Sequence, residues 1–324
     1  MLVSTLIILA VFIAVLTGIA VKDIVLAKRS GRRFNGKTST TAYFMLLPAT
    51  VLIFIFVLLP IVYSLGYAFT DFYLLKPNDI HFNGLDNFKE IFTGIKMKGD
   101  MYNAIVNTAK FVVLVVPLQI GLALGLALFV NRKKPFVGVF KVAFFAPVVI
   151  SLTITAYLWL QILSPSETGL LNAFLGAFGV KPKDYMRDPD RAMLWIVVLS
   201  AWQGCGYQML IFLSGLTNVR KELYEAAALD GAGVFSQFLH VTCPGLRSTF
   251  MFVVVTVFIG ACRVMVQPML MTDYQSHTVT LSYYMYIQGY KYRWVGYSSA
   301  VALLMTIVIG SITYLQRRFL REKD

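Results

Sequence analysis

A cation, Arg263, stands inside a long apolar run of the sequence, and an amide follows four residues later at Gln267. A charge in the hydrocarbon core of a membrane is costly unless it faces protein or water. Three interpretations are open: Arg263 pairs with an acidic residue of another chain, lines an aqueous cavity, or extends its side chain to the membrane surface. Gln267 falls on the same helical face, and Pro268 could open the helix there.

A second apolar run brings aromatic and amide side chains together as Trp202, Gln203, Tyr207 and Gln208. An aromatic ring covers the apolar face of a sugar, and amides bond its hydroxyl groups. Trp and Tyr near the end of a span also form the aromatic belt at the membrane interface. Trp202 and Tyr207 could therefore belong to that belt instead of contacting a sugar. With Arg263, these residues predict a path for an oligosaccharide, and the cation would suit an acidic one.

Catalytic and metal chemistry find no support in the sequence. No carboxylate or cysteine stands at metal-ligand spacing from a histidine, the cysteines have no CxxC spacing, and no His, Asp and Glu cluster suits a membrane-embedded enzyme. We expect buried structural thiols, no catalytic residue, no metal and no cofactor in this chain. The residues concerned are His81, His240, His277, Cys205, Cys243 and Cys262.

The segment Gly31 to Thr38, GRRFNGKT, matches the P-loop pattern G-x-x-x-x-G-K-[ST]. A P-loop requires a buried strand before it and a helix after it, so that backbone N–H groups converge on phosphate. Here an apolar span and a basic run precede the match, and another span follows it. We interpret the match as coincidental and assign its basic residues to anionic lipid head groups.

A polar stretch at residues 217–248 separates two apolar runs. Its first half, KELYEAAALDG, predicts a short helix with carboxylates in its first turn and an Asp-Gly end. Its second half has apolar residues at helical spacing before Pro244, where the chain should restart. The two helices should lie outside the bilayer and dock on a partner. The candidate docking residues are Glu222, Glu225, Ala226, Ala227, Asp230, Gly231, Phe235 and Phe238.

The elements that position these residues are membrane helices. The 324-residue chain is 58% hydrophobic and only 14% charged, with a mean hydropathy of +0.70, which excludes a soluble domain of this size. Apolar runs of about 20 residues predict an all-α polytopic protein. The first run lacks a basic n-region and a clear cleavage site, so we expect a retained helix rather than a signal peptide. Seven transmembrane helices are predicted, at about residues 2–21, 43–69, 105–130, 142–163, 192–216, 250–271 and 297–315.

The distribution of charge sets the orientation. The net charge is +13, but the basic residues gather in short loops beside the spans, which indicates a membrane protein and not a nucleic-acid binder. One set of flanks carries 17 Lys and Arg and the other carries 10, mostly in longer segments. The first set, residues 22–42, 131–141, 217–247 and 317–324, is therefore predicted to be cytoplasmic. The N-terminus would lie outside and the C-terminus in the cytoplasm.

The motif EAAALDGAG, with Phe238 and Pro244 after it, resembles the EAA loop of binding-protein-dependent ABC importers. Residues 43–318 are similar to the maltose-type first permease subunit in LLPATVLIFIFVLLPIVYSLGYAFTDF, FNGLDNFKEIF, NTAKF, LLNAFL, AWQGCGYQMLIFLSGL and GYSSAVALL. Arg220 and Ser248 stand where that family usually has proline, which leaves the ends of the docking helices open.

The resemblance implies a six-span core, with residues 1–42 as an extra helix and linker and 319–324 as a tail. It implies a second homologous permease, two ATPase subunits that bind and hydrolyse ATP with Mg²⁺, and a periplasmic or extracellular binding protein. In such permeases the helix of Arg263 contributes substrate contacts, which favours the cavity interpretation. Within the family, the permease of the alginate importer is similar to this chain.

One rival is a secondary transporter of a small polar solute, driven by an ion gradient. Such transporters use intramembrane carboxylates as proton or sodium sites. The predicted spans contain essentially none, so an ATP-driven importer is the expected class.

Overall fold

The computed structural model describes residues 36–131 and 136–320, and within these ranges the regular secondary structure is helical, with two isolated β-bridges in the connecting loops. The predicted span at residues 2–21 lies outside the described residues. Only the last three residues of the P-loop match, Gly36 to Thr38, are described, and they belong to the first turn of α2.

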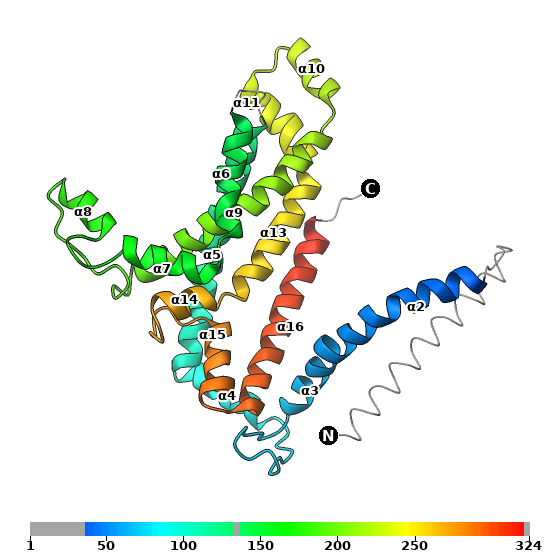
Figure 1. Cartoon of the computed structure of the whole chain (residues 1–324), viewed down its shortest axis with the longest axis vertical. Coiled ribbons are helices and arrows are strands. Elements are labelled where there is room, and N and C mark those ends of the chain that lie inside the picture. The colour runs from blue at the N-terminus through cyan, green and yellow to red at the C-terminus, as the bar shows by residue number, and fades with distance from the viewer. Residues whose placement is uncertain (1–35, 132–135, 321–324) are drawn as a thin grey trace.

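Five helices have at least 16 residues and form the frame in Figure 1. They are α2 (Gly36–Ile53), α5 (Asp100–Val130), α9 (Ala192–Asn218), α13 (Arg247–Cys262) and α16 (Val295–Leu320). The shorter helices are α3 (Leu59–Tyr67), α4 (Asp86–Lys96), α6 (Val137–Val149), α7 (Leu152–Ile162), α8 (Leu170–Gly176), α10 (Lys221–Leu229), α11 (Val234–Gln237), α12 (Cys243–Gly245), α14 (Val266–Met271) and α15 (Leu281–Tyr286). Three π turns join some of them: η1 (Phe54–Leu58), η2 (Phe238–Thr242) and η3 (Ile287–Lys291).

Four described helices are long and apolar enough to cross a membrane, and up to six if each of two bent helix pairs is one span. The straight candidates are Met45–Tyr67, Asp100–Val130, Ala192–Asn218 and Val295–Arg318. The bent pairs are Val137–Val149 with Leu152–Ile162, and Val234–Gly245 with Arg247–Cys262. The all-α polytopic prediction therefore agrees with the structure, while the number seven is not confirmed by it.

The centre of the bundle is the pair α5 and α9, which run side by side (Figure 1) and pack closely along their length. Large side chains from both helices are fully buried there, including Phe111, Ile196, Met209 and Phe212. Gly206 allows α6 to approach α9, because a Cβ atom at this position would collide with the carbonyl oxygen of Phe144. The core thus fixes the relative positions of α5, α6 and α9.

Two predicted spans are broken rather than straight. The span predicted at 142–163 bends by 100° between α6 and α7, where Ile150 and Ser151 adopt extended backbone after Pro147. The span predicted at 250–271 ends as α13 at Cys262 and resumes as α14 at Val266. Arg263 therefore lies at a helix end and not in mid-helix, and the break precedes Pro268 instead of coinciding with it.

The break after α13 is held by side chains from a distant loop. The Thr280 hydroxyl donates to the carbonyl oxygen of Val264 at 2.6 Å, which satisfies one backbone group freed by the break. The Asn107 amide of α5 donates to the carbonyl oxygens of Ser276 and Val279 at 2.8 and 3.0 Å. These buried bonds fasten the loop between α14 and α15 to the core.

The span formed by α2, η1 and α3 diverges from the other helices (Figure 1). Only 6% of its apolar window is buried within the described chain, compared with 56% for α9. Only its C-terminal end, α3, packs on α16 near the end of the bundle that carries α4. This span presents most of its apolar surface to lipid or to another chain.

Candidate translocation cavity and coupling loop

A cavity of about 490 Å³ lies among α5, the α6–α7 bend, α9 and the α13–α14 break. Four of the six side chains predicted for a substrate path line it, although they come from two separate segments of the sequence. The polar lining residues are Gln119, Ser200, Gln203, Gln208, Thr256, Arg263 and Gln267. The described part of this wall offers many hydrogen-bond donors and acceptors and a single charge.

Arg263 follows the last turn of α13 and caps its C-terminal end. A cation is favoured at this position, because the carbonyl end of a helix carries partial negative charge. The side chain is exposed to the cavity, and none of the ion pairs in the described part of the chain includes it. Arg263 is therefore available to a solute or to another subunit.

Two amide side chains of α9 form hydrogen bonds with the elements that surround the cavity. Gln203 donates to the carbonyl oxygen of Ile150 at 3.2 Å and to the Thr155 hydroxyl at 3.3 Å, and so bridges the α6–α7 bend. Gln208 accepts a hydrogen bond at 3.0 Å from Gln119 of α5, and both side chains are buried. Sequence analysis missed Gln119, although an amide deep in the apolar span 105–130 was a signal for it.

Trp202 and Tyr207 do not line this cavity, although they neighbour the two amides in sequence. The Trp202 ring packs against that of Trp159, with 6.0 Å between the centroids, and Tyr207 is exposed but is not among the residues that line the cavity. The structure therefore separates the predicted aromatic residues from the predicted amides.

Gly204 provides the space that Gln119 occupies, because a Cβ atom at position 204 would collide with the Gln119 amide. We expect Gly204→Ala to displace Gln119 and to lower uptake about tenfold, which corresponds to a loss of about 1.4 kcal/mol of interaction with the cargo. Gly125→Ala in α5 is the matched control, since nothing lies within 4 Å of a Cβ there. Initial uptake rates, normalised to the amount of protein in the membrane, measure both; equal rates would contradict the assignment of Gln119 to the path.

The polar stretch 217–248 forms a pair of helices at the end of the bundle where α10 and α11 lie (Figure 1). The first helix, α10, begins at Lys221 directly after Arg220, without a proline. It ends in a Schellman motif, in which the N–H groups of Gly231 and Ala232 donate to the carbonyl oxygens of Ala228 and Ala227 at 3.1 and 2.9 Å. Gly231 has φ +78°, the left-handed conformation that favours glycine.

The second helix of the pair continues from Val234 through Pro244 to Gly245, and the chain then bends by 69° into α13. The bend comes after Gly245 and not at Pro244, where we expected the chain to restart. Pro244 lies in the first turn of α12, directly after the π turn η2, and proline is tolerated at such a position because its missing N–H is not needed there. A hydrogen bond of 2.9 Å between Tyr224 and Thr242 ties the two helices together.

The tip of this helix pair is apolar and uncovered. Leu229, Val234 and Phe235 are 90%, 82% and 73% exposed, whereas Phe238 is half-buried within the pair. Glu222, Glu225 and Asp230 are exposed, and none of them belongs to an ion pair among the described residues. Ala226 is also exposed, and Ala227 is half-buried. An apolar tip flanked by free carboxylates is typical of a docking surface.

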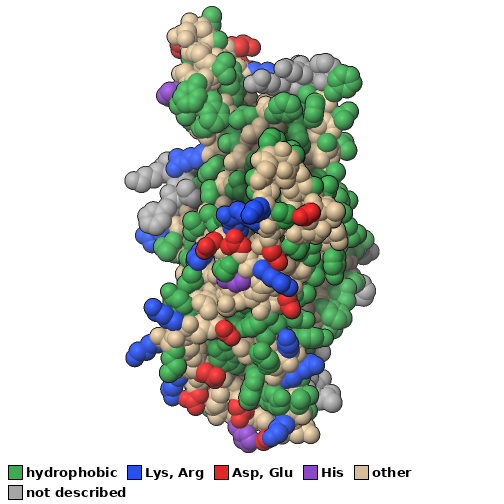
Figure 2. Space-filling model, turned by 90° about the vertical axis from the view of Figure 1, so that its left-hand side faces the viewer, with side chains coloured by type: hydrophobic (Ala, Val, Ile, Leu, Met, Phe, Trp, Pro, Cys, Tyr) green, Lys and Arg blue, Asp and Glu red, His purple; other side chains and the backbone are tan. Residues whose placement is uncertain are grey.

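Charged side chains of both signs gather across the middle of the face that Figure 2 presents. Segment 176–191, on that side of the molecule in Figure 1, contributes the ion pairs Asp184–Arg187 and Asp188–Arg191. Nearby, burial lowers the pKa of His277, and burial beside Asp273 raises the pKa of Tyr283 to about 12. These groups stay neutral near pH 7, so their role is polar rather than ionic.

The described residues contain no group of three His, Cys, Asp or Glu side chains that could hold a metal ion. Of the three cysteines, Cys205 is buried and Cys262 is partly buried, whereas Cys243 is exposed. The expectation of buried thiols fails at Cys243, because α12 lies in the helix pair outside the core.

A polytopic helical bundle with a polar cavity and a projecting helix pair defines a membrane transport subunit. The chain belongs to the family described as "Binding-protein-dependent transport system inner membrane component", which matches residues 111–322. Members of this family are transport components of the inner membrane, which agrees with the several apolar helices found here.

Similar proteins of known name extend over most of the chain. The arabinooligosaccharides transport system permease AraP of Bacillus subtilis is 32% identical over 289 residues, which cover 87% of this chain and 90% of AraP. The lactose transport system permease LacF of Rhizobium radiobacter is 28% identical and covers 85% of this chain and 92% of its own. A bacterial alginate ABC transporter, crystallised with alginate pentasaccharide-bound periplasmic protein, has the same fold at a TM-score of 0.77 and 23% identity, over 88% of this chain and 95% of that one.

Proposed function

We propose that this chain is the permease subunit of an ATP-driven importer that carries an oligosaccharide through the cavity at Arg263. Family membership supports this most strongly, together with the names of relatives that transport arabinooligosaccharides and lactose. Residues 43–318 would form the permease core. An external binding protein delivers the sugar, as in the alginate transporter crystallised with its periplasmic protein.

The helix pair within 217–248 docks on a cytoplasmic ATPase. Its exposed apolar tip enters a cleft of that partner, and its free carboxylates pair with basic residues. ATP and Mg²⁺ bind to the two ATPase subunits, and closure of the ATPase dimer moves the helix pair and rearranges the spans. The charge distribution supports a cytoplasmic position for this loop and for the C-terminus.

A second, homologous permease completes the transport path. The open wall of the Arg263 cavity and the uncovered α2–α3 span are surfaces that such a partner would cover. Among the described residues of the cavity wall Arg263 is the one that carries a charge, which favours as the cargo an oligosaccharide with an acidic unit beside neutral ones.

Purification from native membranes and reconstitution test this proposal. We expect an ATPase and a second permease to co-purify with the chain, and proteoliposomes to take up oligosaccharide only with ATP and the binding protein. Uptake that follows an ion gradient and ignores ATP would refute the proposal in favour of a secondary transporter.

A further inference from the structure

A second polar cavity, which we call the outer pocket, lies at the end of the bundle that carries α4, opposite α10 (Figure 1). It has a volume of about 300 Å³. Its walls come from the segment after α3, from α4, from α15 and η3, and from the beginning of α16. The lining residues on which the argument depends are Asp71, Asn83, Glu90, Gln288, Trp294 and Tyr297.

The floor of the outer pocket is fixed by hydrogen bonds. Asn87 donates to the carbonyl oxygens of Ala68 and Thr70 at 3.0 and 2.9 Å. Asn83 donates to the Asn87 side-chain oxygen at 3.3 Å, and its own side-chain oxygen is buried without a hydrogen-bond partner in the described chain. These bonds hold the segment after α3 against α4 and so fix the floor of the outer pocket.

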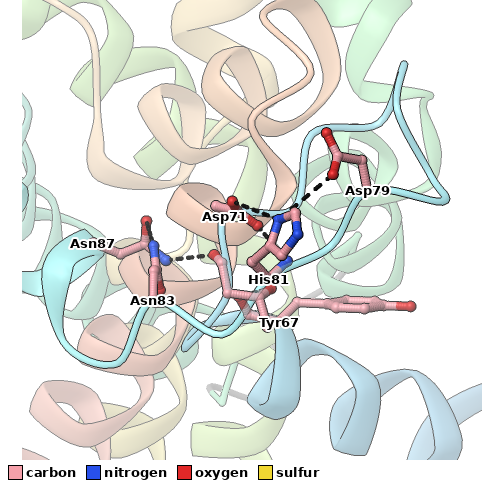
Figure 3. Close-up of polar contacts among 7 residues, drawn as sticks. Tyr67, Asp71, Asp79, His81, Asn83 and Asn87 are labelled. Carbon is pink, nitrogen blue, oxygen red and sulfur yellow. Dashed lines mark hydrogen bonds and ion pairs between the residues drawn. The ribbon is translucent and has the colours of Figure 1, made fainter.

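The pocket offers acceptors and negative charge. Asp71 accepts the backbone N–H of His81 at 2.7 Å and keeps a second oxygen 3.6 Å from the His81 ring (Figure 3). Glu90 is exposed and belongs to none of the ion pairs in the described ranges. None of the described residues that line the pocket is a Lys or an Arg. A ligand rich in hydroxyl donors fits this lining, whereas an anionic ligand is repelled.

Aromatic side chains complete the wall in fixed positions. Trp294 packs against Tyr73 with 4.8 Å between the ring centroids. The hydroxyl groups of Tyr284 and Tyr297 are hydrogen-bonded to each other at 3.1 Å. Rings that cover an apolar face, beside amides and carboxylates that bond hydroxyl groups, are what a sugar ring requires. The volume suits a small ligand, since ligand pockets begin at about 300 Å³.

We propose that the outer pocket binds one neutral sugar unit before it reaches the Arg263 cavity. The proposal rests on the proposed function, because it takes the cargo to be an oligosaccharide. The two sites differ in charge: the Arg263 cavity carries a cation, and the outer pocket carries two carboxylates. The outer pocket therefore selects an uncharged unit and rejects a uronate.

Ligand-detected NMR titration of the complete transporter in nanodiscs, without binding protein or ATP, tests this site. The probes are lactose and arabinotriose, with an alginate trisaccharide as the acidic comparison. We expect both neutral sugars to bind, the uronate not to bind there, and Glu90→Gln and Trp294→Ala to raise the dissociation constant of the neutral sugars at least tenfold. Glu167→Gln is the matched control, because Glu167 is an exposed carboxylate outside the pocket.

Uptake by the same preparations, with ATP and binding protein, separates the possible failures. If the transporter takes up sugar but the NMR titration shows no sugar binding, the proposal for the outer pocket is wrong and the proposed function stands. The same holds if sugar binds but Glu90→Gln leaves the dissociation constant unchanged. Binding of methylammonium in place of sugars overturns it as well, since the pocket would then be a cation site. A transporter that carries no sugar at all overturns the proposed function itself.

Discussion

Replacing Phe235 with aspartate is expected to abolish ATP-driven uptake while the protein remains in the membrane. Phe235 lies at the exposed apolar tip of the helix pair between α9 and α13. Docking would bury the new carboxylate without a partner, at a cost of several kcal/mol. Uptake should fall by about 100-fold or more, since each 1.4 kcal/mol of lost affinity is about tenfold.

A matched control separates docking from a general effect of charge. Phe136, in the connection between α5 and α6, is 76% exposed, close to the 73% of Phe235, and lies outside the helix pair. Phe136→Asp should preserve substrate-stimulated ATPase activity, whereas Phe235→Asp should lose it together with co-purification of the ATPase. Normal stimulation in Phe235→Asp would remove the docking role of the tip.

Replacing Arg263 with glutamine is expected to change which oligosaccharide is carried. Arg263 is the one charged side chain among the cavity lining, and it has no acidic partner in the described ranges. Loss of a desolvated charge contact typically costs about 2 to 5 kcal/mol. The ratio of uronate uptake to neutral oligosaccharide uptake should therefore fall by about 30-fold or more.

Arg263→Lys retains the charge and serves as the control. It should keep most of the preference for the uronate, although lysine lacks the paired geometry of arginine with a carboxylate. Competition uptake with labelled neutral and uronate oligosaccharides measures the ratio directly. An unchanged ratio in Arg263→Gln would show that Arg263 does not contact the acid group of the cargo.

The helical architecture and the helix pair within 217–248 were predictable because both depend on local sequence. The apolar runs identified α5, α9 and α16, and the Asp-Gly pair before Ala232 identified the end of α10. The Schellman motif requires a residue with positive φ at this place, and Gly231 supplies it. Helix ends and apolar spans depend on residues a few positions apart in the sequence. They can therefore be predicted without knowledge of the tertiary structure.

The cavity was only partly predictable because its shape depends on contacts between distant segments. The break at Arg263 is held by Thr280, which lies 17 residues further along the chain, and the nearest proline, Pro268, lies beyond the break. Trp202 and Gln203 are adjacent in sequence yet fall on different faces of α9. An apolar helix gives few clues about which face meets a cavity, so the aromatics could not be separated from the amides.

The divergent α2–α3 span has a consequence for how the protein is made. With 6% of its apolar window buried, this span adds almost nothing to the packing of α5, α9 and α13, and it meets α16 only through α3. Lipid solvates the apolar surface of this span as well as a neighbouring helix would. Packing against the other helices of the same chain would therefore stabilise the span little. The remaining helices can therefore pack together during membrane insertion before this span takes its final position. That position can be set later, when the subunits assemble in the bilayer.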